Sequence, residues 1–356
     1  MAAQIKPDLI IVGQVTVDDV VPAAPAPWRR QIGGSSLYAL AGARLWLDPC
    51  RIGLVARVGR DYPFDVEALL RGVGLKHIAL AKFPGEHLVE WLIYEADGSR
   101  RSLPRNAELL DVGAEGDVGS EGHVESEGDT GSDLGACTPG SAPERAQISG
   151  GDRDEGDTRR APSSLHPYRQ KLLDIAPTAE EIPPSWLPAP AIHLCPQVGT
   201  RHHDSLRFLR KSARWISVDP SPHYSRSLDP TGLAQFLEGT TAFLPSAQEV
   251  RPLLRNKSPE AVAFELHRSG FAEVVLKRGA DPVVLSTMGM TQSIPIAATR
   301  AVDPTGAGDS FCGAYAACRL LGHDPVEAAR RAAASATLVV GCSGVEAALR
   351  LTTPNI

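Results

Sequence analysis

The sequence predicts an α/β fold in which helices cover a doubly wound, mostly parallel sheet. Short β-branched runs alternate with helix-like segments along most of the chain, which is the order that such a sheet requires. The chain has 356 residues, enough for one large α/β domain or two ordinary ones. An apolar fraction of 43% and a mean hydropathy of -0.11 are typical of a globular protein.

The first predicted strand covers residues 8–13, a short β-branched run that ends in glycine. Asp18 and Asp19 follow just past its end. Ligands of parallel α/β sheets gather beyond the carboxyl ends of the strands, so one of these acids could bind a vicinal diol through two hydrogen bonds. A solvated turn acid is the equally weighted alternative.

A helix is predicted over residues 37–47, and Gly33, Gly34 and two serines stand at its start. Glycines there let a ligand approach the backbone closely, and plain helix capping by a serine is compatible with that reading. Residues 86–94 and 100–103 flank Ala96-Asp97-Gly98 and predict a hairpin. This hairpin belongs to a small accessory sheet, which is a candidate lid.

Residues 113–163 differ completely in composition from the rest of the chain. Twelve acidic residues against four arginines give this Gly- and Ser-rich segment a charge of -8, which leaves +2 for the remainder of a chain whose total is -6. Almost no large apolar residue occurs in it, so it cannot bury enough surface to offset the loss of chain entropy. We therefore expect a disordered insertion, either inert or an acidic tether for a partner.

The second half of the chain returns to alternating elements. Strands are expected at 191–195, 215–218, 241–244, 272–277 and 283–286, and helices at 200–210, 260–269 and 326–340.

Residues 303–311, Asp-Pro-Thr-Gly-Ala-Gly-Asp-Ser-Phe, lead directly into an apolar, helix-prone run. Glycines on both sides of a small residue allow a tight turn, and the first N–H groups of the helix add the positive end of its dipole. Together these features predict an anion-binding cradle. Asp309 within it is either an N-cap or a base beside a site that stabilises a transferring phosphoryl group.

Several classes of function are disfavoured by the bulk properties. The net charge of -6 argues against general nucleic-acid binding, and no run of about twenty apolar residues predicts a membrane span. The first residues are too quickly broken for a signal peptide, and six scattered cysteines without a CxxC pair suit a reducing cytoplasm.

These residues resemble the PfkB, or ribokinase-like, carbohydrate kinases. Residues 303–311 are similar to the family's C-terminal signature, and Gly33-Gly34 at a helix start is similar to a second element. Weaker similarities are Gly59-Arg60-Asp61 and Arg105-Asn106-Ala107. The resemblance covers nearly the whole chain apart from 113–163. It implies one domain over residues 1–356, a three-layer α/β/α sandwich with a small β-lid near 86–103.

The resemblance also implies ATP- and Mg2+-dependent phosphoryl transfer to an alcohol. Asp309 is the implied catalytic base, and the backbone of Gly306, Ala307 and Gly308 is the implied anion hole. The other implied site residues are Asp18, Gly33, Gly34 and Tyr38 for the acceptor substrate, Lys277, Gly279 and Thr305 for the nucleotide, Glu249 for magnesium through water, and Asp303 for a monovalent cation such as K+ in members that have one.

Three residues depart from the family pattern. Ser246 replaces the asparagine of the Asn-x-x-Glu motif whose Glu249 is kept, which bears on how magnesium is held. Pro282 stands at the second glycine of the nucleotide-loop Gly-x-x-Gly, and proline suits many turn positions. Tyr38 replaces an asparagine of sugar-specific members, so a differently shaped polyol or a nucleoside is also compatible.

The sequence thus favours a cytoplasmic kinase, monomeric or homodimeric, that acts on a sugar or sugar-like polyol and has no nucleic-acid or membrane partner. The alternatives are a nucleoside or vitamin-alcohol kinase of the same fold and a non-catalytic PfkB-like protein that binds a partner. An intact Asp309 in its glycine cradle favours an enzyme, because a scaffold needs neither.

Overall fold

The computed structural model describes residues 6–21, 28–94, 100–105, 167–299 and 301–352. Within them, a nine-stranded sheet has the order β13-β12-β11-β10-β9-β8-β1-β4-β5. Its seven strands from β11 to β5 are parallel to their neighbours, and β12 and β13 are added antiparallel at one edge. The strands are β1 (Leu9–Val12), β4 (Ile52–Gly59), β5 (His77–Phe83), β8 (Ala189–Leu194), β9 (Ala213–Val218), β10 (Ala242–Phe243), β11 (Glu273–Arg278), β12 (Asp281–Thr287) and β13 (Met290–Ile294).

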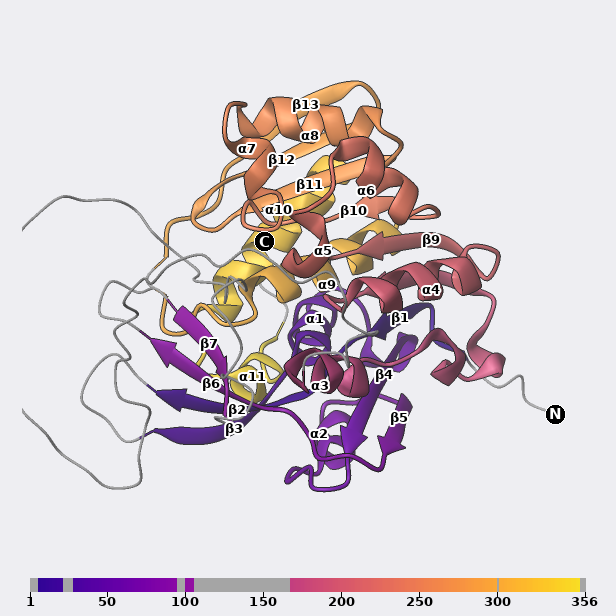
Figure 1. The fold of residues 1–356 in the computed structure, drawn as a ribbon, viewed down its shortest axis with the longest axis vertical. Helices are drawn as coiled ribbons and strands as arrows, with labels where there is room; N and C mark the ends of the chain where they lie inside the picture. Colours follow the sequence, from indigo (N-terminus) through magenta and orange to yellow (C-terminus); the bar gives the residue numbers. More distant parts are fainter. Residues whose placement is uncertain (1–5, 22–27, 95–99, 106–166, 300, 353–356) are drawn as a thin grey trace, which may run out of the picture.

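Helices cover both faces of this sheet (Figure 1). The central strand β1 shows why, because all four of its side chains are fully buried. Leu9 and Ile11 pack in the core under one helical layer, and Ile10 and Val12 pack in the core under the other. The prediction of a three-layer α/β/α sandwich with a mostly parallel sheet is confirmed.

The first layer contains α1 (Ser35–Ala43), α2 (Val66–Gly72), α9 (Ala307–Leu320), α10 (Pro325–Val339) and α11 (Val345–Ala348). The second contains α4 (Gly199–Leu209), α5 (Pro222–Ser225), α6 (Pro230–Phe236), α7 (Arg251–Leu254) and α8 (Pro259–Arg268). α3 (Pro167–Ile175) contacts β4, and short 3-10 turns lie at Pro49–Arg51, Ala179–Glu181 and Pro184–Trp186.

Helices α1 and α9 pack unusually close together, and glycines make this possible. A Cβ atom on Gly42 would lie 1.9 Å from the carbonyl oxygen of Ser310, and one on Gly313 would lie 1.8 Å from that of Ala39. Any side chain at either glycine would force the helices apart. These contacts join the first turns of α9 to the middle and carboxyl end of α1, and so fix the glycine-rich loop relative to α1.

A second sheet has four strands in the order β3-β2-β6-β7 and lies beside α11, away from the β11–β13 edge (Figure 1). They are β2 (Thr16–Val21), β3 (Arg29–Gly33), β6 (Val89–Tyr94) and β7 (Arg100–Pro104). The predicted hairpin strands are confirmed as β6 and β7, while the hairpin tip at 96–98 lies outside the described residues. β2 and β3 enlarge this lid sheet beyond the prediction. Because Asp18 and Asp19 lie within β2, the interpretation of either as a solvated turn acid is wrong.

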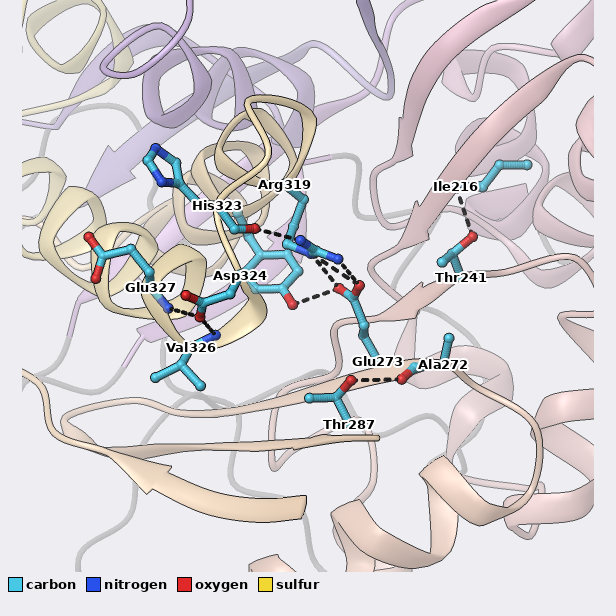
Figure 2. A network of polar contacts seen from close by, with 11 residues as sticks. Ile216, Thr241, Ala272, Glu273, Thr287, Arg319, His323, Asp324, Val326 and Glu327 are labelled. Carbon is cyan, nitrogen blue, oxygen red and sulfur yellow. Dashed lines mark hydrogen bonds and ion pairs between the residues drawn. The ribbon is translucent and has the colours of Figure 1, made fainter. Parts of the chain in front are cut away.

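An ion pair ties α9 to the amino end of β11, far from the carboxyl ends of the strands (Figure 2). The Arg319 guanidinium donates to both carboxylate oxygens of Glu273, the shortest bond being 2.6 Å, and to the backbone oxygen of His323. Asp324 then caps α10 by accepting from the N–H groups of Val326 and Glu327. We regard this network as structural, since it anchors α9 and α10 on the sheet.

In the part of the chain that the structure describes, no helix is both long and apolar enough to cross a bilayer. The five cysteines in that part form no disulfide. The segment predicted to be disordered, 113–163, lies outside the described residues, as do Cys137 and the Asn106-Ala107 pair.

Candidate active site

The glycine-rich loop enters α9 through a left-handed residue. Gly306 is the N-cap, with φ 74, and Asp309 lies in the first helical turn. A side chain at Gly306 would be strained and would also meet the ring of Tyr38, whose Cγ lies 2.0 Å from the ideal Cβ position. The N–H of Ala307 donates to the carbonyl oxygen of Pro304 at 3.3 Å, whereas the N–H of Gly308 lies in the first turn, where no intrahelical acceptor exists.

A buried lysine reaches this loop from the end of β11. The Nζ of Lys277 lies 3.5 Å from the position that a Cβ on Gly308 would take. It donates to Oδ2 of Asp219 at 2.7 Å and to Sγ of Cys312 at 3.1 Å. Lys277 is 8% exposed and Asp219 is 2% exposed. The helix end is therefore supplied with a fixed positive charge beside its glycines.

Asp219 is the acid that sequence reasoning did not assign to the site. It directly follows β9, so the rule that drew attention to Asp18 would also have found it. Its Oδ1 is buried and has no hydrogen-bond partner among the described residues. Burial raises the pKa of Asp219 to about 7 against the opposing effect of Lys277, and Glu249 and Asp309 raise it further. The carboxylates of Asp219 and Glu249 thus act on the Lys277 ammonium, and Asp309 lies close enough to Asp219 to raise its pKa.

Lys277 keeps its proton in this setting. Burial by itself lowers the pKa of Lys277, but Asp219, Cys312 and Glu249 outweigh that effect, so the pKa lies well above its usual range. An unpaired buried ammonium would be costly, and the Asp219 carboxylate offsets that cost. The pair therefore presents a permanent cation at the helix start.

The Ser246–Glu249 turn lies next to the same lysine. Ser246 forms an isolated parallel bridge with Lys277, and its N–H donates to Oε2 of Glu249. The turn predicted from the kept glutamate is thus at the site, although serine replaces asparagine. Gly279 adopts φ 64 in the turn between β11 and β12, and no atom lies within 4 Å of its ideal Cβ position. Pro282 is accommodated in β12, where its carbonyl accepts from Arg278.

The residues that the sequence assigns to the acceptor substrate lie on the four-stranded sheet and in the first half of α1. Asp18 is 3% exposed and accepts from Oγ1 of Thr16 at 2.7 Å. Gly33 leaves room for it, since a Cβ there would lie 1.8 Å from Oδ2 of Asp18. Gly34 is the N-cap of α1 with φ 116 and packs on the carbonyl of Gln14. The contact between Tyr38 and Gly306 then joins this group to the glycine-rich loop.

Asp19 points to the other face of β2 and has a structural role. It is fully buried and accepts from Arg30 at 2.7 and 2.8 Å and from Arg105 at 2.9 Å. Because neighbouring residues of a strand face opposite ways, only Asp18 of the double acid lies against Gly33. Burial raises the pKa of the Tyr62 hydroxyl and the nearby Asp18 charge adds to this rise, which places a further aromatic residue close to Asp18.

Asp303 and Thr305 form the entry to the loop. Oδ1 of Asp303 accepts from the Thr305 N–H at 2.9 Å and from the Tyr94 hydroxyl at 2.5 Å, and Oδ2 accepts from the Gly344 N–H at 3.2 Å. The Tyr94 hydroxyl also contacts Oγ1 of Thr305. Tyr94 ends β6 of the lid sheet, and no sequence motif marks it.

Comparison with known proteins identifies similarity to one family of kinases. The model of the pfkB family carbohydrate kinases matches residues 203–351, which include the glycine-rich loop, Lys277 and Asp219. Over these residues the chain is similar to the pfkB family. The matched region contains the start of α9 and the neighbouring Asp219, Glu249 and Lys277.

Two curated relatives illustrate the range. The 2-dehydro-3-deoxygluconokinase of Escherichia coli K12 is 32% identical over 114 residues, which are 31% of this chain and 37% of that protein. The chain thus matches little more than a third of that relative's length. The cytidine kinase of Thermococcus kodakarensis is 22% identical over 320 residues, 87% of each chain.

Solved structures share the fold over nearly the whole length. A putative ribokinase II of E. coli in complex with ATP and Mg2+ has a TM-score of 0.61 at 19% identity and covers 96% of this chain and 94% of its own. The nucleoside kinase of Burkholderia thailandensis in complex with inosine has a TM-score of 0.61 at 14% identity, covering 95% and 93%. The ribokinase-like fold predicted from sequence is confirmed.

Proposed function

We propose that this protein is an ATP-dependent kinase that transfers the γ-phosphate to a hydroxyl group of a sugar or sugar-like polyol. The observation that carries the proposal is the start of α9. There the Asp309 carboxylate, the left-handed Gly306 and the Lys277 ammonium next to Gly308 come together. A base beside a cluster of N–H and ammonium donors suits the transfer of a charged group to an alcohol.

In the proposed reaction Asp309 accepts the proton of the acceptor's hydroxyl group while the oxygen of that hydroxyl bonds to the γ-phosphorus. The bond from phosphorus to the bridging oxygen of ADP breaks, and the electron pair leaves with ADP. The Gly308 N–H and the Lys277 ammonium stabilise the charge on the equatorial oxygens, because both donors are fixed before the substrate arrives. Asp18 orients the acceptor by accepting hydrogen bonds from its hydroxyl groups.

Magnesium fits the acidic side of this site. The orphaned Oδ1 of Asp219, near Glu249, offers the oxygen ligands that Mg2+ prefers, and that ion commonly uses one or two carboxylates together with waters and phosphates. Among the described residues there is no group of three or more acidic, His or Cys side chains that would hold a metal alone. Asp219 and Glu249 would hold the ion directly or through water, and it would neutralise phosphate charge.

The chemical class of the acceptor is inferred from the residues near Asp18 and from the names of the relatives. The partial relative named 2-dehydro-3-deoxygluconokinase supports a sugar or sugar acid, as does the buried Asp18 beside Gly33. A nucleoside is the second candidate. It is favoured by the 320-residue match to the protein named cytidine kinase and by the Tyr38 ring beside the loop. Cytoplasmic location, where ATP is available, is part of the same proposal.

A substrate screen in two steps tests the proposal. Sugars, sugar acids, polyols and nucleosides are first compared by thermal shift in the presence of an unreactive ATP analogue and Mg2+. Hits are then assayed for ATP consumption and for phosphorylated product, with Asp309→Asn as the matched control. Acceptor-dependent ATP consumption by the wild type alone is the expected result. ATP binding without turnover on any acceptor would favour the non-catalytic alternative.

A further inference from the structure

The lid sheet and the glycine-rich loop are joined at Asp303. Tyr94, the last residue of β6, donates its hydroxyl hydrogen bond to Asp303. Asp303 and Thr305 are only 5% and 7% exposed. Thr305 is the residue immediately before Gly306, so its position sets where the left-handed turn and the start of α9 lie.

A second strand of the lid sheet supports the same place. Arg29 of β3 donates to Oγ of Ser343 at 2.7 Å. The side chain of Gln31, also on β3, lies 2.9 Å from the ideal Cβ position of Gly344. The Gly344 N–H in turn donates to Oδ2 of Asp303. Two strands of the lid therefore contact the two loops that meet at this one carboxylate.

A monovalent cation does not fit the Asp303 carboxylate as it stands. Three protein hydrogens point at its two oxygens: the Tyr94 O–H and the Thr305 N–H at Oδ1, and the Gly344 N–H at Oδ2. A carboxylate offers about four lone-pair positions, and these donors take three of them, including both on Oδ1. A cation at the fourth position, on Oδ2, would be repelled by the positive ends of the three donors. The side chain that the family resemblance assigns to such an ion is thus bound mainly by protein donors.

We propose that Tyr94 takes the place of a monovalent cation at Asp303 and is a positioning residue for phosphoryl transfer. Its hydroxyl fixes Asp303 and Thr305, and through them the Gly306–Asp309 loop, when the lid sheet is in place. The order of the anion-binding loop is then coupled to the lid, and turnover is independent of K+. This inference rests on the proposed kinase function.

The test compares Tyr94→Phe with Tyr168→Phe. The control removes a hydroxyl that also bonds to β6, at Glu90, but not to the glycine-rich loop. Each protein is assayed at matched ionic strength in K+, Na+, Cs+ and tetramethylammonium salts. We expect the kcat of the wild type and of Tyr168→Phe to vary by less than about twofold between salts. A twofold difference in kcat corresponds to about 0.4 kcal/mol of activation free energy.

Tyr94→Phe should lose about tenfold in kcat in tetramethylammonium, with little change in the KM of the acceptor. K+ should restore part of this loss, because Oδ1 of Asp303 gains a lone pair that an ion can use. A general loss of folding would lower activity equally in every salt. Strong activation of the wild type by K+, or unchanged kcat in Tyr94→Phe, would overturn the proposal.

Melting temperatures separate this inference from the proposed function. An ion that binds only the folded state stabilises it by RT ln(1 + c/Kd), where c is the free ion concentration, with or without turnover. K+ in place of tetramethylammonium should therefore raise the melting temperature of Tyr94→Phe and leave that of the wild type unchanged. If no acceptor is phosphorylated, the kinase proposal fails, whereas this salt comparison still decides whether Tyr94 occupies the cation's place. An equal rise in both proteins would contradict the inference.

Discussion

The Nζ of Lys277 lies 2.7 Å from Oδ2 of Asp219, and both side chains are buried at the start of α9. Buried ion pairs are seldom retained for stability, since apolar residues of similar volume are often neutral or better. This pair has a second feature, an Asp219 oxygen without a partner among the described residues. We interpret the pair as a device that holds a cation against Gly308.

Lys277→Met should reduce kcat by about a hundredfold, which is the loss of about 2.7 kcal/mol of transition-state stabilisation. It should also destabilise the fold by about 3 kcal/mol because Asp219 is left without its counter-charge. Lys277→Met combined with Asp219→Asn should recover stability but not turnover. Chemical denaturation and steady-state kinetics on the wild type and the two variants measure both effects. If the double variant also regains turnover, Lys277 has no role beyond the ion pair.

Asp18→Asn should raise the acceptor KM about tenfold or more and leave the KM for ATP near its original value, because Asp18 faces Gly33 and not the Lys277 side. Asp19→Asn is the matched control on the same strand. It weakens the bonds to Arg30 and Arg105, so it should lower the melting temperature without changing the acceptor KM. A raised acceptor KM in Asp19→Asn and an unchanged one in Asp18→Asn would show that Asp18 does not bind the acceptor.

Gly306→Ala should destabilise the protein by more than about 2 kcal/mol, since it combines a left-handed backbone with a clash against Tyr38. Gly322→Ala is the control, because Gly322 also has a positive φ, of 89, but no atom lies near its ideal Cβ position. It should cost about 1 kcal/mol from backbone strain alone. If urea denaturation gave the same loss of unfolding free energy for Gly306→Ala and Gly322→Ala, the contact with Tyr38 would not be tight.

Stability should fall as the pH is lowered from 7.5 to 5. Burial lowers the pKa of His193 to about 3, and those of His87 and His202 to about 4, so the folded state binds three fewer protons than the unfolded state below about pH 6. Asp219 has the opposite effect, because its raised pKa lets the folded state bind one more proton than the unfolded state in this pH range. The net slope is then about 2.7 kcal/mol per pH unit between about 4 and 6. An unfolding free energy that stays constant from pH 7.5 to 5 in denaturant titrations would contradict the burial of these three histidines as neutral side chains.

Many strands and helices were predictable from the sequence, because apolar periodicity indicates the type of element and glycines mark tight turns and close contacts. The strand that ends at Gly13 and the helix after Asp309 follow from local patterns. Asp219 could have been found from its place directly after β9, but its buried pairing with Lys277 could not, because Lys277 lies 58 residues away. Tyr94 was missed for the same reason, since it meets Asp303 across 209 residues. The strand role of Asp18 and Asp19 was hidden because β2 pairs with β6, which is remote in sequence.

The central claim is that Asp309 is the base at the start of α9, and single-turnover phosphoryl transfer by Asp309→Asn tests it most directly. The amide has a similar shape but cannot accept the proton, so the ATP-analogue affinity and melting temperature should stay near the wild-type values. The rate of product formation with the best acceptor should fall by at least about a thousandfold. A rate within about tenfold of the wild type, with ATP still bound, would contradict the account.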